Sequence, residues 1–232
     1  RLAGDPEYPP ALHVDKRWAT LGDASPAGQT ATASILSWLD TPGPAFVLVL
    51  GVSGSGKTFL LRNLAHELAD REGLIPVLIT VRDLTKGRTL DELLAQHMAR
   101  NDEDPFHGGA FRYLLREGRI ALLFDGFDEL ALRTSHERVP QHFATLREAA
   151  AGAAKVVVTS RHQYFATDQS VRNSLGDDVH RLPGSRIIQL APLTSSQRRD
   201  LVVKAFDDNQ AADEFLEALR DVPDLSTNPR ML

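Results

Sequence analysis

The fold of this chain is constrained most by one eight-residue stretch, Gly51–Thr58, which reads GVSGSGKT. It directly follows an unbroken apolar run, Phe46–Leu50, and directly precedes a leucine-rich helical pattern, Leu60–Leu68. A strand, a glycine-rich loop and a helix with the spacing G-x-x-x-x-G-K-T predict a phosphate-binding loop. The alternative is a glycine-rich turn that binds no ligand.

Each residue type in this loop has a chemical reason to be there. Glycines let the backbone turn its amides toward one point, because a positive φ costs them little. Those amides and the start of the following helix attract anionic phosphate oxygens. Lys57 can reach the outer phosphates, and the Thr58 hydroxyl can bind the accompanying magnesium. We expect a nucleotide to contact Gly51, Ser53, Gly54, Ser55, Gly56, Lys57, Thr58 and Phe59.

Composition narrows the class of protein. A chain of 232 residues with 42% hydrophobic residues can build one α/β domain with a small addition. A net charge of −5, from 26 basic and 31 acidic residues, argues against dedicated nucleic-acid binding. The chain has no cysteine, and its eight histidines have no metal-ligand spacing. It also lacks a signal peptide and any run near the roughly 18 apolar residues of a membrane span, so we expect a cytoplasmic location.

Apolar runs alternate with helical patterns along most of the chain. Strands are predicted at Phe46–Leu50, Ile75–Val81, Ile120–Phe124, Lys155–Thr159 and Arg186–Leu190. This alternation predicts an α/β fold in which a five-stranded parallel sheet is covered by helices on both faces. The Ile75–Val81 strand is apolar on both faces, which predicts a central position in the sheet. An alanine- and leucine-rich helix is predicted at Glu137–Ala151.

Carboxylates follow the third of these strands. Asp125 comes at its carboxyl end, where open α/β sheets place their ligands. A P-loop NTPase needs an acid there to hold magnesium, so Asp125 and Thr58 are the predicted metal residues. A second carboxylate must orient or deprotonate the attacking water, and Asp128 and Glu129 are the candidates, with Asp128 favoured. The alternative for all three acids is a solvated acidic loop.

An arginine ends the next strand. Thr159-Ser160-Arg161 is placed, in P-loop NTPases of this kind, between the loop strand and the Asp125 strand. Arg161 would then face the γ-phosphate and stabilise the charge of the transferred group. A surface salt bridge is the alternative role for this side chain.

Three segments are predicted. Residues 1–28 are rich in proline and glycine and form an extended lead-in; residues 29–191 form the P-loop NTPase core. Residues 192–232 form a truncated helical lid subdomain, which begins at a capping box of Thr194 and Gln197. Within the lead-in, residues 8–14 either pack on the core or line one side of a nucleotide base. Because the chain begins without methionine and stops beside a motif, we expect a piece of a longer protein.

Several motifs in a fixed order resemble the NACHT domain of the STAND class of signalling NTPases. The motifs are Gly51–Thr58, Asp125–Leu130, Thr159–Arg161, Leu190–Leu193 and Asn228-Pro229. The class includes animal NOD-like receptors and bacterial antiphage sensors. A small residue after the magnesium acid, with an acidic pair further on, distinguishes this pattern from AAA+ motors, in which glutamate follows directly. The resemblance spans about residues 45 to 232.

The resemblance implies an ATP-driven switch that uses ATP or ADP with Mg²⁺ and in which Pro229 packs on the adenine. ADP would hold a closed monomer. ATP, together with a trigger bound elsewhere, would favour an open form that assembles into a homo-oligomer and activates an attached effector. A bacterial source and an antiphage role fit this picture, with slow hydrolysis by the isolated piece.

Three other functions are weighed against the switch. An AAA+-like motor or remodeller would use hydrolysis as its work cycle. A nucleotide-binding scaffold would not hydrolyse, but Lys57, Thr58, Asp125 and Asp128 are all in place. A kinase lacks any evident acceptor site and ranks last.

Overall fold

A computed structural model describes residues 12–20, 28–81, 89–100, 107–127, 148–150, 152–162, 179, 181–219 and 229. The elements in chain order are β1 (Trp18–Thr20), α1 (Ala31–Asp40), β2 (Ala45–Gly51), α2 (Lys57–Ala69), β3 (Ile75–Thr80), α3 (Leu90–Arg100), α4 (Gly108–Arg116), β4 (Ile120–Asp125), β5 (Lys155–Arg161), β6 (Ser185–Leu190), α9 (Ser195–Phe206) and α10 (Asn209–Ala218). Most of the helix predicted at Glu137–Ala151 lies outside the described residues.

The strands form one sheet in the order β1-β6-β2-β5-β4-β3. The five predicted strands are all present and pair in parallel. The predicted number of strands was wrong by one, because β1 in the lead-in adds antiparallel to β6. The three residues of β1 are too few to show a strand pattern in the sequence. The pairing of β1 comes from the free edge of β6.

The predicted central position of β3 was also wrong. β3 ends the sheet in the described part of the chain and pairs there with β4. Its apolar residues still have a reason, since Ile79 and Leu78 pack into apolar layers on opposite faces of the sheet. An apolar run indicates that both faces of the sheet are covered at that strand. It carries no information on whether the hydrogen-bonding edge has a neighbour.

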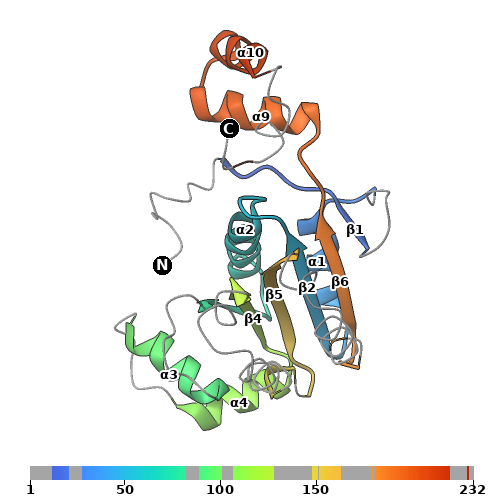
Figure 1. Cartoon of the computed structure of the whole chain (residues 1–232). Helices are drawn as coiled ribbons and strands as arrows, with labels where there is room; N and C mark the ends of the chain where they lie inside the picture. The colour runs from blue at the N-terminus through green and yellow to red at the C-terminus, as the bar shows by residue number, and fades with distance from the viewer. Residues whose placement is uncertain are drawn as a thin grey trace.

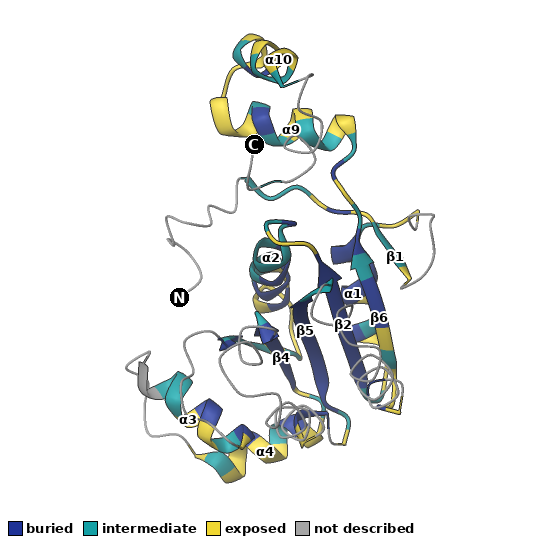
Figure 2. Ribbon diagram, in the orientation of Figure 1, coloured by how far each residue is buried: buried dark blue, intermediate teal, exposed yellow. Residues whose placement is uncertain are grey.

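Two apolar layers enclose the sheet, and alternation along β2 shows how (Figure 2). Val47 and Val49 face the layer that contains α1 and α2. Phe46, Leu48 and Leu50 face the layer that contains α3 and α4. All seven residues of β2 are buried, so helices cover both faces of the sheet as predicted.

Beyond the sheet, α9 and α10 form a separate helical pair. Figure 1 shows this pair at the end of the molecule toward which the carboxyl ends of β2 and β6 point. The predicted capping box is present, with Thr194 accepting from the Gln197 amide and the Gln197 side chain accepting from the Thr194 amide. Residues 12–17 of the lead-in pass between α9 and the sheet before the chain enters β1 (Figure 1).

Candidate active site

The loop between β2 and α2 has the backbone geometry that the motif predicts. Gly54 and Gly56 take left-handed φ angles of 75° and 91°, which residues other than glycine rarely adopt. Gly56 is also the N-cap of α2, and no side chain caps that helix. The first amides of an α-helix lack the i−4 carbonyl partner of the helix ladder, and a helix N-terminus is therefore a common binding site for anions.

Lys57 lies folded over the same loop. Its Nζ donates to the carbonyl oxygens of Gly51 and Val52, each at 2.9 Å. These bonds hold the ammonium at the mouth of the loop rather than out in solvent. A phosphate placed at the α2 amides would meet a positive charge that is already in position.

Gly51 is needed for a steric reason as well. A Cβ at this position would lie 2.4 Å from Ser55 Oγ, so the loop packs directly onto the end of β2. Ser55 is 5% exposed, and its hydroxyl has no hydrogen-bond partner among the described residues. The Ser55 amide closes the turn by donating to the Val52 carbonyl at 3.2 Å.

Asp125 lies on the face of the sheet that α2 covers. Ala121 and Leu123 of β4 belong to the apolar layer of α1 and α2, and side chains two apart on a strand share a face. Asp125 is 9% exposed and its Oδ1 accepts from Thr159 Oγ1 at 2.8 Å. The acid and the phosphate-binding loop are therefore on one face, at the carboxyl ends of their strands.

β5 lies between the loop strand and the acid strand, as predicted. It pairs with β2 along seven residues, which sets Arg161 beside Gly51. Its other edge pairs with β4 up to Val158 and Phe124. Arg161 is thus the last residue of β5, next to the first glycine of the loop, and it is half-buried.

The remaining predicted residues divide into two groups. Pro229 lies beside the loop, because its Cγ is 3.8 Å from the position that a Gly56 Cβ would take. His13 and Val14 are half-buried, and residues 8–11 lie outside the described residues. Asp128 and Glu129 lie outside them too, directly after Phe127, which is buried.

The donor set suits magnesium. Thr58 offers a hydroxyl and Asp125 a carboxylate, and hard oxygen ligands are what Mg²⁺ prefers. In the described ranges no group of three or more histidine, cysteine or acidic side chains could hold a metal. In P-loop sites magnesium is bound by few protein ligands together with phosphate oxygens and water.

Sequence reasoning missed two features near the site. One is the contact of Thr159, a residue predicted only as part of the Thr159–Arg161 motif and whose hydroxyl bonds to Asp125; a threonine in a strand is an ordinary β-former, so its type does not predict this bond. The other is residues 13–17, which we call the strap. The strap accepts hydrogen bonds from Gln197 at the Asp15 carbonyl and from Lys204 at the His13 carbonyl, the latter at 2.7 Å.

The strap also carries titratable groups with shifted pKa values. Lys16 is 3% exposed, its Nζ has no hydrogen-bond partner among the described residues, and burial lowers its pKa to about 8. A hydrogen bond from His13, at 3.2 Å, lowers the pKa of Asp15 despite partial burial. Through its bonds with Gln197 and Lys204, the strap joins α9 to the core by polar contacts.

Comparison with known proteins identifies the class. Residues 45–209 match the family model of the NACHT domain. An uncharacterised WD repeat-containing protein from Nostoc sp. is 25% identical over 212 residues, which cover 84% of this chain and 14% of that protein. The chain thus spans about one-seventh of the length of this relative. None of the helices in the described ranges has the length and apolar character that a bilayer crossing requires.

Solved structures show the same fold. Domain III of the replication initiation protein DnaA from Thermotoga maritima matches with a TM-score of 0.53 and 18% identity, over 85% of this chain and 78% of that one. AMPPCP-bound DnaA from Aquifex aeolicus matches with a TM-score of 0.50 and 16% identity, over 79% of this chain and 54% of that one. With the NACHT match covering most of its length and the loop, sheet order and acid in place, the chain belongs to the NACHT family of P-loop NTPases.

Proposed function

We propose that this chain binds ATP and ADP with magnesium and hydrolyses ATP slowly, as the switch of a cytoplasmic signalling protein. The observation that carries the proposal is the placement of β5. β5 has the loop strand β2 on one side and the Asp125 strand β4 on the other. The loop and Asp125 both lie on the face of the sheet that α2 covers. A nucleotide's phosphates on the α2 amides would thus lie near a carboxylate suited to their metal.

In this proposal each residue has a distinct task. The loop amides from Gly54 to Thr58 bind the phosphates, and Lys57 exchanges its bonds to Gly51 and Val52 for phosphate oxygens. Thr58 and Asp125 hold magnesium, which when bound neutralises charge on the β- and γ-phosphates. Arg161 contacts the γ-phosphate, and Pro229 packs against the adenine.

Hydrolysis requires a base in addition to these groups. A water attacks the γ-phosphorus, the bond to the β–γ bridging oxygen breaks, and ADP and phosphate leave. Asp128 takes the proton of the water, with Glu129 as the alternative base. The two follow Asp125 by three and four residues, so either can approach the same end of the sheet.

Regulation is the part of the proposal that depends on the family. A NACHT switch would be closed with ADP, and ATP with a trigger would open it, assemble a homo-oligomer and activate an effector. The size of the Nostoc protein, of which this chain matches 14%, and its WD repeats favour a trigger-sensing region elsewhere in a long chain. A role in bacterial antiphage defence is consistent with such an arrangement.

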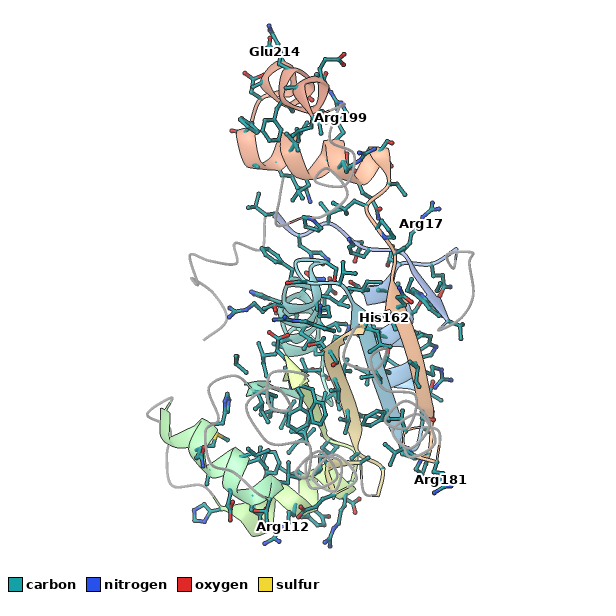
Figure 3. The ribbon with its side chains drawn as sticks, in the orientation of Figure 1. Arg17, Arg112, His162, Arg181, Arg199 and Glu214 are labelled. Atoms are coloured by element: carbon teal, nitrogen blue, oxygen red, sulfur yellow. The ribbon has the colours of Figure 1, made fainter. Side chains whose placement is uncertain are left out.

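Calorimetric titration with ATP and ADP tests the binding site. Lys57→Ala should weaken nucleotide affinity by roughly 10²-fold, since it removes a charge-assisted contact to phosphate. Arg112→Ala is the matched control, because Arg112 is an exposed cation on α4, at the opposite end of the molecule from α9 (Figure 3). Unchanged affinity in Lys57→Ala would overturn the proposed site.

Single-turnover hydrolysis tests the base. Asp128→Ala should keep binding and slow hydrolysis by roughly 10²-fold or more, as expected for a lost general base. If Glu129→Ala is the slow variant instead, the assignment between the two acids is reversed. Fast turnover by the pure monomer would favour an AAA+-like motor, and tight binding without hydrolysis a scaffold.

A further inference from the structure

We propose that Thr159 is a positioning residue for the magnesium-binding carboxylate of Asp125 and for the loop that leaves it. The inference rests on the proposed function and adds a residue to it. Thr159 is 0% exposed, and its hydroxyl bonds to Asp125 and to the backbone on either side of it. Its effect on the reaction would be exerted through Asp125.

The hydrogen bonds of Thr159 can be assigned from distance and charge. Oγ1 lies 2.8 Å from Asp125 Oδ1, 3.0 Å from the Gly126 amide nitrogen and 3.5 Å from the Phe124 carbonyl oxygen. A hydroxyl has one proton to donate, and a carboxylate is the stronger acceptor at the shorter distance. The proton therefore goes to Asp125, and a lone pair of Oγ1 accepts the Gly126 N–H.

This arrangement fixes one carboxylate oxygen and leaves the other for the metal shell. Without the hydroxyl, the Asp125 side chain could rotate about its terminal torsion, which is broad in carboxylates. Losing a partner that orients a metal ligand in this way typically costs about 10- to 100-fold in metal affinity or activity. Thr159 thus selects the orientation in which Asp125 can bind magnesium through a single oxygen.

The second bond controls the chain after Asp125. Gly126 has a left-handed φ of 77°, so the backbone turns sharply where β4 ends. The Thr159 bond to its amide ties that turn to β5. The buried Phe127 follows Gly126, so this bond fixes the backbone at the last described residues after β4.

Replacing the hydroxyl tests the inference. Thr159→Val keeps the shape and removes both hydrogen bonds, whereas Thr159→Ser keeps the hydroxyl. The readout is the Mg²⁺ concentration that gives half of the metal-dependent gain in ATP affinity, measured by titration calorimetry. Thr159→Val should raise this concentration roughly 10- to 100-fold, the usual effect of losing a partner of a metal ligand. Thr159→Ser should stay within about threefold of the wild type.

Two controls separate positioning from simple structural support. ATP affinity in EDTA should be the same in wild type and Thr159→Val, because the phosphate-binding loop is untouched. Ser160→Ala should behave as wild type in every titration, since Ser160 is equally buried and its hydroxyl has no partner among the described residues. If Thr159→Val fails to fold, Thr159→Cys takes its place, with a weak S–H donor and a shift in the same direction.

The outcomes are distinct. A normal magnesium requirement in Thr159→Val, in a protein whose wild type binds MgATP, overturns the role of Thr159 alone. Equal losses with and without EDTA overturn it as well, because they indicate general damage to the site. Absence of nucleotide binding by the wild type overturns both this inference and the proposed function.

Discussion

The sheet and the α9–α10 pair are held in place by different kinds of contact. The central strands β2 and β4 are buried along their whole length, whereas α9 and α10 each contribute one buried residue, Val202 and Ala212. The helical pair is instead joined to the core through the strap, by side chains donating to backbone carbonyls. The stabilisation from apolar burial grows with the area removed from water, while each such hydrogen bond contributes only about 1 kcal/mol net.

This difference indicates which part of the molecule opens at the lower free energy. A region held by few apolar contacts and by solvent-accessible hydrogen bonds opens at a lower free energy than the global unfolding. The sheet, which sets the loop and the acid relative to each other, belongs to the stable part. The helical pair, with one buried residue in each helix, belongs to the part that opens at the lower free energy.

The largest effect is expected from a matched pair of core valines. Val157 in β5 and Val202 in α9 are 0% and 1% exposed, so truncation to alanine removes similar buried atoms. Val157→Ala should lower the free energy of unfolding by about 2–3 kcal/mol, as cavities in packed cores do. Val202→Ala should lower it by less than half as much in the same urea titration. Equal losses would show that sheet and helical pair unfold as one unit.

An intermediate effect of opposite sign is expected from Lys16→Met. Burial disfavours the ammonium, so a neutral side chain of similar length should raise the free energy of unfolding at pH 7 by about 1–3 kcal/mol. Between pH 8 and the ordinary lysine pKa of 10.5, the unfolded wild type holds a proton that the folded form has lost. Wild-type stability therefore rises with pH in this window, and the advantage of Lys16→Met should shrink from pH 7 to pH 10. A constant advantage would mean that packing, not charge, is responsible.

The smallest effect is expected at the strap. Lys204→Met removes the bond to the His13 carbonyl and should speed hydrogen exchange roughly 3- to 10-fold, equivalent to about 1 kcal/mol, at the amides of Ala31 and Ala191. These two amides donate to the strap carbonyls of Lys16 and Arg17. Arg199→Met is the control, because its exposed pair with Asp213 lies within α9–α10 and away from the strap. If both variants speed exchange equally, the strap is not what joins the helical pair to the core.

How far the sequence predicts this molecule depends on the range of the interactions. The sequence predicts the phosphate-binding loop and the acid at the end of β4, because each depends on a pattern shorter than ten residues. These patterns are the glycine spacing and an apolar run that ends in an acid. The pairing of β1 depends on β6, more than a hundred residues away, and the position of β3 depends on β4, 45 residues away. No local pattern predicts either pairing. The same holds for Thr159, whose partner Asp125 is 34 residues distant.

The seven-residue ladder between β2 and β5 has a consequence for how this site can evolve. Loop and acid are separated by two inter-strand spacings, about 10 Å in all, which peptide hydrogen bonds fix. Side-chain replacement can change what fills that span, but it cannot widen or narrow it. Any nucleotide used here must bring phosphate, metal and water that together bridge a length set by the backbone.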